Sequence, residues 1–68
     1  MKSFENKLEG TWQEFEALIR DTIGSDFRWR VRPQDTRSNR EMIVSLILED
    51  INRNNGVFPE KNAFIEKE

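Results

Sequence analysis

Residues 27–32 read Phe-Arg-Trp-Arg-Val-Arg, so apolar and charged residues alternate strictly over this stretch. Successive side chains of a β-strand point to opposite faces, and the pattern therefore predicts a strand with one apolar face and one arginine face. Phe27, Trp29 and Val31 share one face, and Arg28, Arg30 and Arg32 share the other. A lone strand leaves its backbone N–H and C=O groups unpaired, so this strand needs a second one, from this chain or from another.

Before this strand, apolar residues recur every three or four positions, which predicts an amphipathic helix over residues 3–23. A shorter helix is the alternative, because Thr11 and Glu14 have the spacing of a capping box. We prefer the longer helix, since the apolar stripe crosses Gly10 without a change of phase.

After the strand, the most apolar run of the chain predicts a second helix, over about 39–54. Ser38 and Glu41 have the spacing of a capping box at its start. The apolar arc of this helix is wider than one neighbouring helix covers. The helix is therefore either central to the monomer or shared with a second subunit.

The C-terminal tail allows two interpretations. Val57 and Phe58 can form a short strand that pairs with residues 27–32. Alternatively, Pro59 starts a single helical turn over the residues that follow it. The pattern leaves both open, so residues 57–66 are either strand or helix.

The length of 68 residues predicts one small domain spanning 1–68. The chain has no cysteine and no histidine, so the commonest general base, thiolate ligands and the Cys-His and Ser-His nucleophile systems are absent. Its three isolated glycines cannot build a phosphate-binding loop. We therefore expect a protein that is not an enzyme and that uses no metal ion and no cofactor.

No stretch has the character of a targeting or membrane segment. The longest apolar run, residues 42–48, is far shorter than a membrane helix, and residues 1–10 are too polar for a signal peptide. We therefore expect a cytoplasmic protein with no membrane partner.

The net charge of -2 at pH 7 conceals a basic block in the middle of the chain. Residues 28–40 contain five arginines and one acidic residue, Asp35, whereas the sequence on both sides is acidic. The arginine guanidinium presents a planar fork of donors that suits carboxylates and phosphates, so the block favours a specific contact with an acidic partner. With the tryptophan beside them, a residue enriched at binding hot spots, the candidate partner-binding residues are Arg28, Trp29, Arg30, Arg32, Arg37 and Arg40.

Three interpretations of these arginines compete. They can pair internally with acidic residues such as Glu9 and Glu16, bind an acidic surface of another protein, or contact the phosphates and base edges of nucleic acid. The net acidity of the chain argues against non-specific DNA affinity, which is mainly electrostatic. Trp12 and Trp29 lie on apolar stripes, where tryptophan is more often part of the core than a ligand platform.

Over residues 27–54, an alternating strand followed by a capped helix resembles the layout of the ribbon-helix-helix repressors. In that family, a dimer presents a two-stranded ribbon whose outward side chains read the major groove of DNA. The resemblance implies a DNA-binding regulator that uses this same strand. The chain departs from that layout in the helix before the strand and in the lack of a full second helix after Gly56.

We therefore expect an α+β fold in the order α-β-α, with a long N-terminal amphipathic helix, one alternating strand, a second apolar helix and a short tail. The lone strand and the wide apolar arc of the second helix also predict a homodimer. For function, we expect a small regulator or inhibitor that binds a protein partner with an acidic surface through its arginine-rich strand face. The alternative is a DNA-binding regulator that uses this strand as part of a dimeric ribbon.

Overall fold

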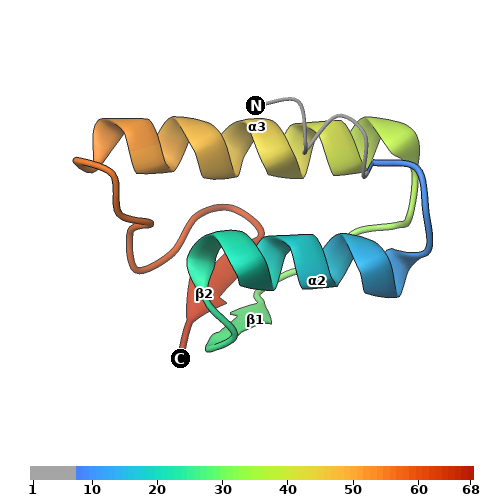
Figure 1. The fold of residues 1–68 in the computed structure, drawn as a ribbon, viewed down its shortest axis with the longest axis horizontal. Coiled ribbons are helices and arrows are strands. Elements are labelled where there is room, and N and C mark those ends of the chain that lie inside the picture. Colours follow the sequence, from blue (N-terminus) through green and yellow to red (C-terminus); the bar gives the residue numbers. More distant parts are fainter. Residues whose placement is uncertain (1–7) are drawn as a thin grey trace.

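The computed structural model describes residues 8–68, in which the elements follow the order helix, strand, helix, strand (Figure 1). Figure 1 shows α3 running above α2 in the same direction, with the two strands below α2. The arrangement confirms the expected α+β class of a small domain. The four elements are α2 (Trp12–Ile23), β1 (Phe27–Trp29), α3 (Arg37–Arg53) and β2 (Ile65–Lys67).

Helix α2 begins at Trp12 because a complete capping box stands before it. The Thr11 hydroxyl accepts the backbone N–H of Glu14 over 3.1 Å, and the Glu14 carboxylate accepts the backbone N–H of Thr11 over 2.9 Å. Gly10 has a φ of +153°, which favours glycine and interrupts a helix. The preferred helix over residues 3–23 is therefore wrong at its start, and residues 3–7 of that prediction lie outside the described residues.

Strand β1 pairs with β2 in an antiparallel sheet, in which Arg28 lies opposite Glu66. The pairing continues for one residue past β1, where the Arg30 N–H donates to the Phe64 carbonyl over 2.8 Å. The alternating stretch is thus a strand at its start only. Val31 shares the apolar face of the predicted strand with Phe27 and Trp29, but it is 60% exposed, because the chain has left the sheet by that position.

The tail supplies the partner strand, but not at the expected residues. Val57 and Phe58 form no strand and Pro59 starts no helix, whereas Ile65–Lys67 pairs with β1. On its other side β2 meets the segment before it, where the Lys67 N–H donates to the Glu60 carbonyl over 2.8 Å.

Helix α3 confirms the second predicted helix but starts two residues earlier than expected. Its N-cap is Thr36, whose hydroxyl accepts the N–H of Asn39 over 3.1 Å, so the capping box predicted at Ser38 is wrong. Ile43, Val44 and Ile47 are buried, whereas Met42 is 49% exposed.

The core lies where α2 and α3 meet the end of the tail. It is built from buried apolar side chains of both helices, of β2 and of the loops, and the aromatic rings of α2 and β1 pack along its edge. Within residues 8–68, no helix is both long and apolar enough to cross a membrane. The fully buried side chains are those of Phe15, Ile19, Ile43, Ile47 and Ile65.

Candidate functional site

The fold divides the six candidate partner-binding residues into two groups. Arg28 and Trp29 lie on β1, and Arg30 and Arg32 follow it closely, whereas Arg37 and Arg40 lie in the first turns of α3. In Figure 1, β1 and the start of α3 are well separated, because α2 lies between the sheet and α3. The basic block of the sequence is therefore not one continuous surface.

We call Arg28, Arg30 and Arg32 the strand arginines, and all three side chains are exposed. The Arg28 guanidinium lies 3.5 Å from the Glu66 carboxylate across the sheet, with its side chain 63% exposed. The Arg30 side chain donates over 2.7 Å to the backbone carbonyl of Asn62, and this acceptor carries no charge. Neither Arg30 nor Arg32 forms an ion pair with any residue of the described chain.

The internal partners considered for the strand arginines are engaged elsewhere. Glu9 pairs with Arg37, and Glu16 lies 4.0 Å from Arg20 of its own helix. Arg28 has a carboxylate beside it, but Arg30 and Arg32 carry positive charge that no described carboxylate neutralises.

Trp29 holds β1 against α2. Its indole N–H donates to the Glu16 carboxylate over 2.8 Å, and its ring lies 5.6 Å from that of Trp12 and 6.0 Å from that of Phe27. The side chain is half-buried at the edge of the core. Trp29 thus positions the strand arginines, and it is not presented as a free aromatic surface.

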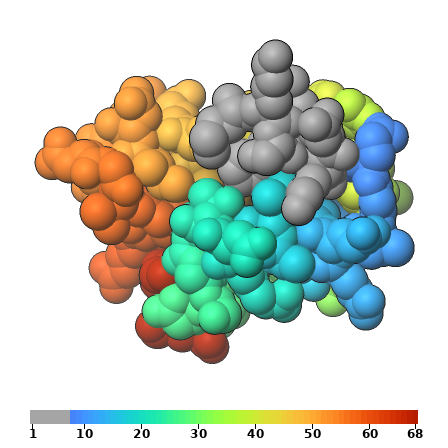
Figure 2. All heavy atoms as spheres, in the orientation of Figure 1, coloured from blue at the N-terminus to red at the C-terminus, as the bar shows by residue number. Residues whose placement is uncertain are grey.

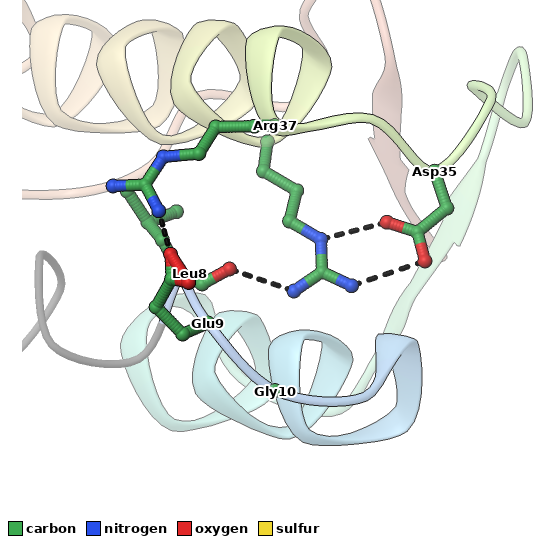
Figure 3. Close-up of a pocket in the computed structure, with 6 residues that line it drawn as sticks. Leu8, Glu9, Gly10, Asp35 and Arg37 are labelled. Atoms are coloured by element: carbon green, nitrogen blue, oxygen red, sulfur yellow. Dashed lines mark hydrogen bonds and ion pairs between the residues drawn. The ribbon is translucent and has the colours of Figure 1, made fainter.

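Arg40 is buried, with 7% of the residue exposed. Its Nε and Nη2 donate to the two oxygens of Asp35 over 2.7 and 3.0 Å, and its Nη1 donates to the Leu8 carbonyl over 2.8 Å (Figure 3). The guanidinium also lies 5.4 Å from the ring of Phe15 and 5.7 Å from that of Trp12. Arg40 therefore ties the residues before α2 to the start of α3, and each of its three nitrogens already donates to a group of the chain.

The Arg40 pair also has an electrostatic signature. The hydrogen bond from Arg40 holds the pKa of the Asp35 carboxyl below its ordinary value, and the same bond raises the pKa of Arg40. At the end of the sheet, the hydrogen bond from Lys67 similarly lowers the pKa of Asp26. Both carboxylates are therefore charged at neutral pH.

A pocket of about 290 Å³ lies beside this pair (Figure 3). Arg37, at its rim, pairs with Glu9 and also lies 3.3 Å from Glu41. Because both arginines of the pocket already face carboxylates, the pocket offers no uncompensated positive charge to an anion. It is lined by Leu8, Glu9, Gly10, Asp35, Arg37 and Arg40.

Asn62 supports the candidate surface and was not identified from the sequence. Its side-chain oxygen accepts the N–H groups of Phe64 and Ile65 over 2.8 and 2.9 Å, and its amide donates to Asp50 over 3.0 Å. Its backbone carbonyl accepts the hydrogen bond from Arg30. The only sequence signal is that asparagine often bonds to the backbone two residues further on in a turn.

In residues 8–68, no cluster of three or more histidine, cysteine, aspartate or glutamate side chains is placed to hold a metal ion. Comparisons with protein-family models, with curated proteins and with solved structures found no significant match to this chain.

Proposed function

We propose that this protein is a small non-catalytic regulator or inhibitor that binds an acidic surface of another protein through the strand arginines. The observation that carries the proposal is the state of Arg30 and Arg32. Both are exposed, and neither has an ion-pair partner among residues 8–68, whereas the arginines of both helices are paired. Positive charge left uncompensated directly after an ordered strand suits recognition of carboxylates.

The surroundings of these arginines support the proposal. Trp29 is fixed by its bond to Glu16, so the backbone that carries the arginines is ordered before a partner arrives. A surface ordered in advance loses less conformational freedom on binding. The exposed pair between Arg28 and Glu66 is weak, on the order of 0–1 kcal/mol, so Arg28 can exchange that carboxylate for one on a partner.

Two further expectations remain proposals of the same kind. We expect a cytoplasmic location, and we expect a homodimer. Met42 and Leu48 of α3 are exposed and apolar, and they are the side chains that a dimer would cover.

The test is affinity capture with purified tagged protein, followed by identification of what binds and titration with the purified partner. The matched variants are Arg32→Glu and Arg53→Glu, which reverse one exposed arginine each. We expect Arg32→Glu to weaken binding by about ten-fold or more, and Arg53→Glu to change it by less than about two-fold.

The same titration with generic duplex DNA separates this function from its alternative. If DNA binds with a steep salt dependence that Arg32→Glu removes, the strand arginines serve nucleic acid and the proposed function is wrong. If Arg32→Glu and Arg53→Glu bind the captured protein equally well, the strand arginines are not the binding surface.

A further inference from the structure

The two edges of the small sheet are unlike. On the β2 side, the segment 60–62 covers the strand, since the Lys67 N–H donates to Glu60 and the Asn62 N–H donates to Ile65, each over 2.8 Å. On the β1 side, the described residues provide no further strand, because the sheet consists of β1 and β2 alone. Within residues 8–68, strand β1 therefore has an open edge.

The register shows which groups form that edge. The Asp26 carbonyl accepts the Glu68 N–H over 2.9 Å, Arg28 lies opposite Glu66, and the Arg30 N–H donates to Phe64. These residues direct their backbone groups towards β2. Since N–H and C=O groups alternate in direction along a strand, the backbone groups of Phe27 and Trp29 point away from β2.

Val31 continues this edge beyond the sheet and is 60% exposed. Figure 2 shows the residues of β1, coloured light green, at the lower surface of the molecule. The edge ends at Pro33, which has no backbone N–H to offer. It is thus short, and it runs beside the strand arginines for its whole length.

We propose that this edge accepts, as a third strand, an extended segment of the partner protein in which acidic and apolar residues alternate. The inference rests on the proposed function and specifies how that partner binds. Main-chain hydrogen bonds to Phe27 and Trp29 supply affinity, and acidic side chains beside Arg28 and Arg30 supply specificity. The apolar residues of the segment lie on the other face of the sheet, on the side of the Phe27 and Trp29 rings.

Charge disfavours a second copy of this chain as the occupant in the registers that centre on Trp29. If two β1 edges pair antiparallel with Trp29 opposite Trp29 or Val31 of the copy, Arg28 and Arg30 face arginines of the copy; only a shift that brings Phe27 opposite Phe27 or Trp29 places Asp26 opposite an arginine. Like charges directly opposite on a sheet destabilise the pair. With an acidic segment, the interaction between opposite side chains becomes attractive. Arg30 has no competing carboxylate among the described residues.

The probe is a labelled synthetic peptide that alternates glutamate and valine, titrated by fluorescence anisotropy and by amide hydrogen exchange. We expect binding, and we expect it to slow exchange of the Trp29 and Val31 N–H groups. A peptide of the same composition in block order should bind at least about ten-fold more weakly. So should the alternating peptide N-methylated at every residue, because it lacks the backbone donors of both edges.

A matched pair of protein variants tests the edge itself. Val31→Pro removes an outward N–H and Val31→Ala keeps it. We expect Val31→Pro to lose about ten-fold in peptide affinity and Val31→Ala to stay within about two-fold of the wild type. The N-methylated peptide gives the same information on the unaltered protein if Val31→Pro does not fold.

Several outcomes overturn strand addition while leaving the proposed function intact. In the first, the captured partner binds but does not slow amide exchange at Trp29 and Val31. In the second, the alternating and N-methylated peptides bind equally well. In the third, the alternating peptide does not bind. Slowed exchange on self-association would place a second copy at the edge, and slowed exchange with duplex DNA would place nucleic acid there. Either result also overturns the inference. Failure of Arg32→Glu to weaken the captured partner contradicts the proposed function instead.

Discussion

Trp29 donates its indole N–H to the Glu16 carboxylate over 2.8 Å, and this bond joins β1 to the middle of α2. Glu16 is 18% exposed at its side chain and lies 4.0 Å from Arg20. The bond therefore lies at the edge of the core, where a hydrogen bond competes with less water than at an open surface. With Trp29 held inwards, its neighbours Arg28 and Arg30 are directed outwards.

Trp29→Phe should lower the free energy of unfolding by about 1–2 kcal/mol, because it removes a hydrogen bond to a charged acceptor. Trp12→Phe is the matched control, since the buried indole N–H of Trp12 bonds to no group of the described chain. Its removal should cost less than the change at Trp29. Urea unfolding followed by circular dichroism measures both, and equal losses would contradict the assigned role of the Trp29 bond.

Arg40→Met should lower the free energy of unfolding by about 2 kcal/mol, because Arg40 makes charged hydrogen bonds to Asp35 and to the Leu8 carbonyl. Arg37→Met removes an arginine that is 55% exposed, and its ion pairs should contribute no more than about 0.5 kcal/mol. Denaturant titration compares the two variants. If Arg37→Met proves the more damaging, the assignment of Arg40 as the structural arginine is wrong.

Stability should decline as the pH falls below about 4. Asp26 and Asp35 have pKa values below their ordinary range in the folded protein, so the unfolded chain binds protons first. These two groups therefore contribute full stability above the unfolded pKa of about 3.9 and lose it as pH falls through the folded values. Thermal unfolding across this range should show a shallower loss for Asp35→Asn and for Arg40→Met than for the wild type. If the variants and the wild type lose thermal stability with pH in the same way, this explanation is wrong.

The structure places the N-caps at Thr11 and Thr36, whereas the sequence pattern favours other starts for both helices. Thr11→Ala and Thr36→Ala should each cost about 1 kcal/mol of unfolding free energy, since each hydroxyl accepts a backbone N–H at a helix start. Ser38→Ala should change stability by less than about 0.5 kcal/mol, because Ser38 is exposed and inside the first turn of α3. If Ser38→Ala lowers the free energy of unfolding more than Thr36→Ala does, Ser38 and not Thr36 is the N-cap of α3.

Both helices and the start of the strand could be predicted, because their apolar periodicity is long enough to read. The ends of the elements could not. Two capping signals compete within three residues at Thr36 and Ser38, and only the backbone conformation decides between them. At Gly10 the apolar stripe stays in phase although the backbone is not helical. Periodicity records which side chains face the core and not whether the chain between them is continuous.

The partner strand escaped prediction because Ile65–Lys67 is three residues long and has one fully apolar side chain. Its placement depends on Asn62 and on contacts between residues distant in sequence, which no local pattern records. The same limit applies to the candidate surface. In the sequence, the arginines of residues 28–40 cannot be told apart. In the structure, Asp35 and the aromatic rings of α2 surround Arg40, whereas Arg30 and Arg32 are exposed.

The central claim is that the strand arginines without an internal carboxylate bind an acidic protein. The most direct test is the Kd of the captured and purified partner for the wild type and for Arg30→Gln/Arg32→Gln, measured by titration calorimetry at an ionic strength of about 0.15 M. We predict a Kd at least about ten-fold higher for the double variant, while the free energy of unfolding falls by no more than about 1 kcal/mol through loss of the Arg30–Asn62 hydrogen bond. An unchanged Kd for a folded double variant would contradict the claim.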